Sequence, residues 1–128
     1  MTDLATARAI LDTLIGFDTT SRNSNLELVG GVEDYLSQHG VASQRVPNGD
    51  GRKANLFATC GPAVEGGVIL AGHTDVVPPG DEAAWTRGPF QAEIADDVLW
   101  GRGASDMKGA IASMVAGVAR HLQTEGQP

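Results

Sequence analysis

The sequence predicts an α/β fold, and three observations support that prediction. Two helical repeats of apolar residues open the chain, short apolar runs separated by turn-forming residues follow, and a third helical repeat closes it. The 128 residues, 41% of them apolar and 20% charged, have the size and composition of a single globular domain. We therefore expect a mixed sheet flanked by helices.

Two helices are expected in the first forty residues. The first covers residues 3–15, where apolar side chains recur at helical spacing and Gly16 ends the repeat. The second begins at residues 24–27, which carry a capping-box pattern of serine and glutamate. In that pattern each side chain satisfies a free backbone amide, and we expect the helix to run on to a stop near Gly40.

Three short strands are expected next. They cover residues 41–46, 55–59 and 68–71, and turn-forming residues close the first two. The third is an unbroken apolar run, which predicts burial on both of its faces. His73 and Asp75 follow its carboxyl end directly, where ligands usually bind in open α/β sheets.

A hairpin and a last helix complete the expected fold. Residues 90–94 and 98–100 are expected to pair around a turn near Asp96-Asp97. Glycines at 101 and 103 mark a tight passage into the last helix. The larger apolar side chains of that helix are expected to form its buried stripe: Ile111, Met114, Val115, Val118 and Leu122.

Charge and cysteine content narrow the class of protein. The net charge of −7 argues against nucleic-acid binding, which needs a basic face on the protein. We interpret the acidic surface as a source of solubility. No run reaches the roughly 18 apolar residues of a membrane helix, and the first residues lack the pattern of a secretory signal. The single cysteine, Cys60, is expected to be a small packing residue. We expect a cytoplasmic protein with neither nucleic acid nor membrane as a partner.

Three side chains are candidates for a metal centre: His73, Asp75 and Asp106. Imidazole and carboxylate are the groups that hold a hydrolytic zinc ion. We interpret His73 as a ligand and Asp75 as the carboxylate that fixes its tautomer. Asp106 comes from another loop, and its two oxygens can bridge two cations.

Simpler interpretations of the same side chains remain open. A histidine at the end of a strand is often a hydrogen-bonded packing residue. Asp106 lies just before the last helix, where a carboxylate interacts well with the helix dipole. Capping and metal binding are compatible roles for that carboxylate.

Three motifs resemble those of one family in their order, amino-acid sequence and spacing. They are Leu-Ala-Gly-His-Thr-Asp-Val-Val-Pro at 70–78, Trp-Thr-Arg-Gly-Pro-Phe at 85–90 and Leu-Trp-Gly-Arg-Gly-Ala-Ser-Asp-Met-Lys-Gly at 99–109. The chain resembles the family of acetylornithine deacetylase and succinyl-diaminopimelate desuccinylase, zinc metallohydrolases related to aminoacylase and carboxypeptidase. The resemblance runs through nearly all of the chain. It implies the N-terminal portion of a zinc-exopeptidase-like catalytic domain.

The resemblance implies a role for each candidate. His73 corresponds to the terminal ligand of one zinc ion, and Asp75 to the catalytic carboxylate that orients it. Asp106 corresponds to the bridging ligand, followed in this family by a cis peptide bond. The implied cofactor is zinc, two ions in a complete site, with cobalt as an alternative. No substrate-binding residue is assigned.

Within the family, residues 15–26 are most similar to the opening region of acetylornithine deacetylase. This implies cleavage of N-acetyl-L-ornithine into ornithine and acetate, in arginine biosynthesis, by a homodimeric parent protein. A succinyl-diaminopimelate desuccinylase and a carboxypeptidase-like peptidase are the alternatives, each acting on a small N-acyl amino acid or peptide. The loop at 80–84 departs from the shorter loop of the family pattern.

The family pattern continues after the bridging aspartate with a glutamate pair, a further carboxylate and a late histidine. None has a matching position here: Glu125 stands alone and His121 is interpreted as a surface residue. We expect residues 1–128 to be the N-terminal part of the catalytic domain, without its C-terminal half and its lid and dimerisation domain. We also expect the isolated chain to be an inactive fragment with at most weak metal binding or self-association.

Overall fold

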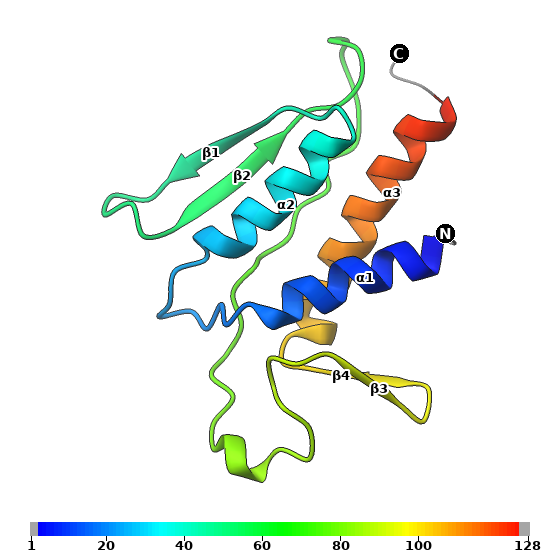
Figure 1. Cartoon of the computed structure of the whole chain (residues 1–128). Coiled ribbons are helices and arrows are strands. Elements are labelled where there is room, and N and C mark those ends of the chain that lie inside the picture. The colour runs from blue at the N-terminus through cyan, green and yellow to red at the C-terminus, as the bar shows by residue number, and fades with distance from the viewer. Residues whose placement is uncertain (1–2, 126–128) are drawn as a thin grey trace.

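The computed structural model of the protein describes residues 3–125, and it confirms the α/β class. Predictions that rest on residues 1–2 or on Pro128 lie outside the described range. None of the helices in that range is long and apolar enough to cross a membrane. The elements follow one another as shown in Figure 1: α1 (Asp3–Gly16), α2 (Leu26–Gln38), β1 (Ser43–Pro47), β2 (Ala54–Ala58), a 3-10 turn (Glu82–Ala84), β3 (Glu93–Ala95), β4 (Val98–Trp100), an irregular turn (Ala104–Lys108) and α3 (Gly109–Glu125).

The four strands form two separate antiparallel hairpins. In the first, β1 pairs with β2 from Ser43 opposite Ala58 to Pro47 opposite Ala54. In the second, β3 pairs with β4 around the predicted turn, where Asp96 and Asp97 both adopt positive φ angles of 52° and 60°. A single mixed sheet is therefore not present in residues 3–125. The only parallel pairing described there is an isolated bridge between residues 20 and 76.

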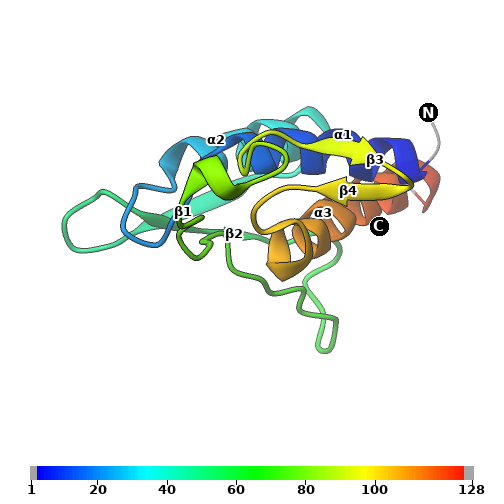
Figure 2. The ribbon, with the colours of Figure 1, turned by 90° about the horizontal axis from the view of Figure 1, so that it is seen from below.

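Two layers enclose the core. Figure 2 shows α1 and α2 on one side, with α3 and the β1–β2 hairpin beneath them. Apolar side chains from all three helices meet between the layers, and each fully buried leucine contributes about 2 kcal/mol to folding. The core cluster consists of Leu14, Leu28, Ile111 and Ala112. An ion pair between Arg120 and Asp3, 2.5 Å long, joins the end of α3 to the start of α1.

The buried face of α3 differs from the predicted stripe. Ile111 is buried as expected, but the other buried positions of the helix are alanines, whereas Met114, Val118 and Leu122 are only partly buried. α3 packs along α1, and the distance between packed helices depends on the size of the side chains in contact. The small side chains of the buried alanines allow close packing against this face of α3.

The predicted capping box at the start of α2 is wrong. The N-cap position is Asn25, which makes no capping hydrogen bond with its side chain. That side chain instead pairs with both backbone groups of Ala54 in β2. The Ser24 hydroxyl accepts a hydrogen bond of 3.2 Å from the Leu26 amide and so satisfies one free amide of the helix.

The third predicted strand is also wrong. Residues 68–71 are extended but unpaired, and their side chains are largely exposed, Ile69 at 90%. No strand in the described range lies beside this segment, so the apolar run has no sheet to pack into. Cys60, expected to pack inside, is exposed as well. The segment still leads directly into His73 and Asp75, which belong to the candidate site.

Candidate metal centre

Two side chains that are distant in the sequence meet at the candidate site. Nε2 of His73 lies 3.0 Å from Oδ1 of Asp106. Two atoms bound tetrahedrally to one zinc ion at about 2.0–2.1 Å are roughly 3.3 Å apart, so the observed separation suits a shared cation. The peptide bond between Asp106 and Met107 is cis, as the resemblance implied. Half of the His73 side chain and 87% of the Asp106 side chain are exposed, which leaves the site accessible to an ion and to water.

The other nitrogen of His73 faces Asp75. Nδ1 lies 3.2 Å from Oδ1 of Asp75 and 3.1 Å from the backbone oxygen of the same residue. A proton on Nδ1, donated to Asp75, leaves the lone pair of Nε2 free for a cation. The three candidates therefore lie together in the arrangement predicted for a ligand, its orienting carboxylate and a second ligand. Their functional roles stay predictions.

The charges of the candidate site favour the binding of a cation. The hydrogen bond to the backbone oxygen of Asp75, together with the carboxylates of Asp75 and Asp106, raises the pKa of His73 above its ordinary value despite some burial. The hydroxyl of Ser21 and the nearby imidazole lower the pKa of Asp75. Asp75 therefore remains an anion, and the imidazole lies between two acidic side chains that attract a proton or a metal ion.

The segment from Phe17 to Ser21 holds the histidine loop in place. The hydroxyl of Thr19 donates a hydrogen bond of 2.6 Å to the carbonyl of Thr74. Backbone hydrogen bonds run from the Val76 amide to the carbonyl of Thr19, at 3.0 Å, and from the Ser21 amide to the carbonyl of Val76, at 3.1 Å. Residues on both sides of Asp75 are thereby fixed to one short piece of chain.

The same piece of chain holds the Asp106 loop through a buried lysine. Lys108 is completely buried, and its Nζ donates a hydrogen bond of 2.7 Å to the carbonyl of Phe17. Burial lowers the pKa of Lys108 to about 8, while the charge of Asp18 acts in the opposite direction. The sequence analysis missed this residue. A lysine beside Met107, at the start of a helix whose next residues are small or apolar, is the signal that could have identified it.

Glycines let the two loops pack directly on each other. Gly103 adopts a φ of 78°, and a Cβ there would lie 2.4 Å from Cγ1 of Val76. A Cβ at Gly72 would lie 3.1 Å from Cε of Met107. The amide of His73 points at the sulfur of Met107, 3.4 Å away. A larger residue at Gly103 would therefore push the histidine loop away from the aspartate loop.

The described residues do not form a complete metal site. Within residues 3–125, no group of three or more histidine, cysteine or acidic side chains is arranged to hold a metal ion. His121 is exposed on α3, as predicted, and Nδ1 of His39 contacts the carbonyl of Tyr35. The donor set of this region therefore fits two ligands and one orienting carboxylate, and it does not fit a complete two-zinc site.

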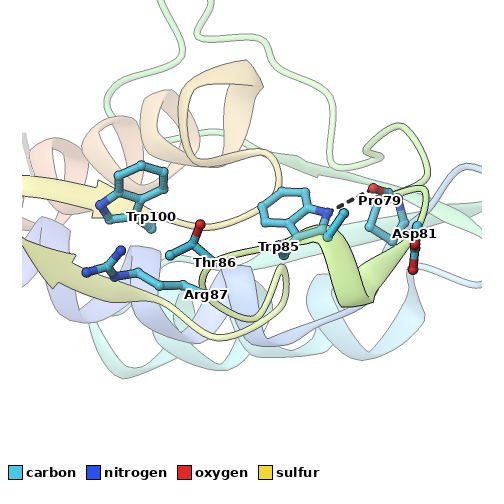
Figure 3. A pocket seen from close by; sticks show the side chains of 7 residues that line it. Pro79, Asp81, Trp85, Thr86, Arg87 and Trp100 are labelled. Carbon is cyan, nitrogen blue, oxygen red and sulfur yellow. Dashed lines mark hydrogen bonds between the residues drawn. The ribbon is translucent and has the colours of Figure 1, made fainter.

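A separate hollow of about 370 Å³ lies among residues of the 79–87 loop and β4. Figure 3 shows Trp85 at its wall, where the indole nitrogen donates a hydrogen bond of 2.9 Å to the carbonyl of Pro79. The guanidinium of Arg102 lies 4.9 Å from the Trp85 ring, and that of Arg87 lies 5.2 Å from the Trp100 ring. None of the three predicted site residues lines this hollow. The loop that departs from the family pattern therefore contributes Asp81 and Ala84 to this hollow, which lies outside the candidate metal centre.

Part of this chain is similar to a known peptidase family. Residues 69–128, which contain all three predicted site residues, match the family model described as Peptidase family M20/M25/M40. The match covers 60 of the 128 residues, so it makes this part of the chain similar to the family. Peptidases are hydrolases, so the enzyme class predicted by resemblance is supported at the level of the family.

Two curated relatives are similar to about three quarters of this chain. Succinyl-diaminopimelate desuccinylase of Maricaulis maris (strain MCS10) is 56% identical over 97 residues, which are 76% of this chain and 24% of the relative. The protein of the same name from Rhodopseudomonas palustris (strain BisB18) is 48% identical over 101 residues, 77% of this chain and 26% of the relative. The aligned part of the chain spans about a quarter of the length of these relatives. Both relatives carry the name that was an alternative above, and neither supports acetylornithine as the substrate.

Proposed function

We propose that this chain contributes part of a two-zinc site to a hydrolase that cleaves the amide bond of an N-acyl amino acid. The observation that carries the proposal is the 3.0 Å approach of Nε2 of His73 to Oδ1 of Asp106. The match of residues 69–128 to a peptidase family supports it independently. In this proposal the remaining ligands and the general base belong to parts of the protein beyond residues 3–125.

The residues of this chain would prepare the site for the ions. Zinc, when bound, polarises the acyl carbonyl and lowers the pKa of water. His73 would hold one ion through Nε2, because Asp75 accepts the proton of Nδ1. Asp106 has one carboxylate oxygen near the imidazole, and its exposed side chain leaves the second oxygen free for another ion. This division of roles is the reason to assign Asp106 as the bridge.

The names of the relatives favour N-succinyl-diaminopimelate as the substrate. N-acetylornithine is the second candidate, because residues 15–26 resemble the opening region of acetylornithine deacetylase. Both are small N-acyl amino acids with a second amino group. For the isolated chain we propose weak zinc binding without turnover, since two ligands and one orienting carboxylate do not complete the site. A homodimeric parent, in the cytoplasm, is part of the same proposal.

A chimera tests the function. Residues 1–128 replace the matching quarter of the Maricaulis maris relative, and the purified chimera is loaded with zinc or cobalt. Release of succinate from N-succinyl-diaminopimelate is compared with release of acetate from N-acetylornithine. We expect metal-dependent turnover that prefers the succinyl substrate and is lost in His73→Ala and in Asp106→Ala. A folded, metal-loaded chimera that cleaves neither substrate would refute the proposal, and a preference for N-acetylornithine would establish the second candidate.

A further inference from the structure

The hydroxyl of Ser21 donates a hydrogen bond of 2.6 Å to Oδ2 of Asp75, across 54 residues of sequence. The other oxygen of the same carboxylate, Oδ1, lies 3.2 Å from Nδ1 of His73. Ser21, Asp75 and His73 therefore form a chain of three side chains that ends at the nitrogen facing Asp106. We propose that Ser21 is a positioning residue of the metal centre, whose hydroxyl holds the Asp75 carboxylate in the orientation that accepts the Nδ1 proton of His73. The inference rests on the proposed function and extends it.

The backbone of Ser21 is fixed, so its hydroxyl acts from a defined place. Its amide donates to the carbonyl of Val76 at 3.1 Å, and its carbonyl accepts a hydrogen bond from Nζ of Lys53. The hydroxyl has a second possible acceptor in the carbonyl of Val76, at 3.4 Å. The carboxylate oxygen is much closer and carries charge, and hydrogen bonds to ionised acceptors are the shorter and stronger ones. Ser21 therefore points its proton at Asp75.

The carboxylate of Asp75 depends on such a partner. About half of the Asp75 side chain is exposed, so packing alone does not restrict rotation of the carboxylate. With Oδ2 bound to Ser21, the other oxygen is directed at the imidazole. Without the hydroxyl, the carboxylate can rotate towards water and lose its contact with Nδ1. Groups that orient a metal-binding histidine in this way typically change metal affinity about 10–100-fold when they are removed.

The position of Ser21 separates this role from a contribution to folding. Ser21 is exposed, and loss of one exposed hydrogen bond has little effect on the stability of a fold. Ser21→Ala is therefore expected to fold like the original chain. Ser113→Ala is the matched control, because the Ser113 hydroxyl is also exposed and donates a hydrogen bond of 2.9 Å, but to the carbonyl of Gly109 on α3.

The first test measures the tautomer of His73 by nitrogen-15 NMR of the metal-free 128-residue chain along a pH titration, at the alkaline end where the ring signals stop changing. Asp106 lies 3.0 Å from Nε2 and competes with Asp75 for the ring proton in the metal-free chain. We expect Ser21→Ala to lower the Nδ1-protonated fraction below that of the original chain. Ser21→Thr, which keeps the hydroxyl, restores it, and Ser113→Ala leaves it unchanged. An unchanged tautomer in Ser21→Ala, or an equal loss in Ser113→Ala, would overturn the proposal.

The second test is a zinc titration of the same chains, followed through the His73 signals so that millimolar affinities can be measured. We expect Ser21→Ala to weaken zinc binding about tenfold. The same change in an Asp75→Ala background has no further effect, because its acceptor is gone. Equal affinities of Ser21→Ala and the original chain would count against positioning. The metal-free tautomer does not depend on hydrolysis, so an inactive chimera with an intact Ser21 effect refutes only the proposed function.

Discussion

The ammonium group of Lys108 donates a hydrogen bond to the backbone carbonyl of Phe17, 91 residues away in the sequence. This bond places the Asp106 loop against the same short segment, residues 17–21, that is hydrogen-bonded to residues 74 and 76. Both loops that carry candidate ligands are therefore held in place by a third segment, residues 17–21, which carries no candidate ligand. Mutations in that segment are expected to act on the metal centre without touching a ligand.

Removal of the buried Lys108 side chain tests how the lysine holds its loop. Lys108→Ala leaves a cavity where the aliphatic stem lies, and we expect a loss of about 2 kcal/mol in the free energy of unfolding. Lys108→Met refills most of that space. It also leaves the Phe17 carbonyl with its hydrogen bond from the Thr19 amide, so its loss should stay below about 1 kcal/mol. Urea unfolding followed by circular dichroism gives both values. Equal losses would show that the ammonium group, and not the stem, carries the effect.

The stability of the 17–21 segment should depend on pH through Asp18. Burial opposes ionisation of Asp18, but two hydrogen bonds from Thr20 together with Asn23 and Arg22 lower its pKa below 3.8. A carboxyl with a lowered pKa in the folded state stabilises the fold above its unfolded pKa, and this stabilisation is lost as the pH falls through the folded pKa. Asp18→Asn should therefore be less stable than the original chain at pH 7, and the difference should shrink below about pH 3.8.

Urea unfolding at a series of pH values measures this difference for Asp18. Thr20→Val serves as the comparison, because it removes the hydroxyl that donates at 2.6 Å and keeps the backbone amide that donates at 3.0 Å. Its pH dependence should lie between those of the original chain and Asp18→Asn. A difference that stays constant from pH 7 down to pH 2 would contradict the proposed source of the shift.

Local patterns in the sequence were sufficient for much of the fold. Helical spacing of apolar residues predicted α1 closely, and an Asp-Asp pair between apolar runs predicted the β3–β4 turn, where both residues adopt positive φ. The failures came where the partner was remote. Apolar content predicted burial of residues 68–71, yet burial needs a neighbouring strand, which the described range does not provide. Spacing on α3 also could not show that alanines occupy most of its buried positions.

In the candidate site, too, local sequence predicted some features, while those that depend on distant residues were missed. His73, Asp75 and Asp106 lie together, as predicted from the motif sequences and from ligand chemistry. Ser21 and Lys108, which reach them or their loops across 54 and 91 residues, had no local signal strong enough to assign a partner. A hydroxyl or an ammonium group identifies a donor in the sequence, whereas its acceptor depends on the tertiary fold.

Substitution of Gly103 tests whether close contact between the two candidate-ligand loops contributes to the stability of the fold. Gly103→Ala must adopt a positive φ and also place a methyl group 2.4 Å from Val76. Gly51→Ala shares the positive φ, at 71°, but its Cβ would meet nothing within 4 Å. We expect Gly51→Ala to cost about 1 kcal/mol and Gly103→Ala roughly 3 kcal/mol, because overpacking adds to the backbone strain. Differential scanning calorimetry of the two variants measures the gap, and similar melting temperatures would show that Val76 moves aside freely.

The Asn25 side chain joins the start of α2 to the outer edge of β2. The backbone groups of Ala54 face away from β1, because the hydrogen bond from the Asn48 amide to the Lys53 carbonyl makes the neighbouring pair the hydrogen-bonded one. The Asn25 amide donates to the Ala54 carbonyl at 2.9 Å and accepts from the Ala54 amide at 3.0 Å. Ala54 is buried, so Asn25→Ala leaves two backbone groups unsatisfied, and we expect a loss of about 2–3 kcal/mol.

Asn25→Asp keeps the acceptor for the Ala54 amide but loses the donor, so its loss should be intermediate. Asn23→Ala is the control, because the Asn23 side chain interacts with Asp18 rather than with Ala54, and it should cost about 0.5 kcal/mol. Urea unfolding gives the order of the three variants. Hydrogen exchange of the Ala54 amide locates the effect, since exchange should accelerate in Asn25→Ala and stay slow in Asn25→Asp. Slow exchange in Asn25→Ala would mean that another group can replace the asparagine.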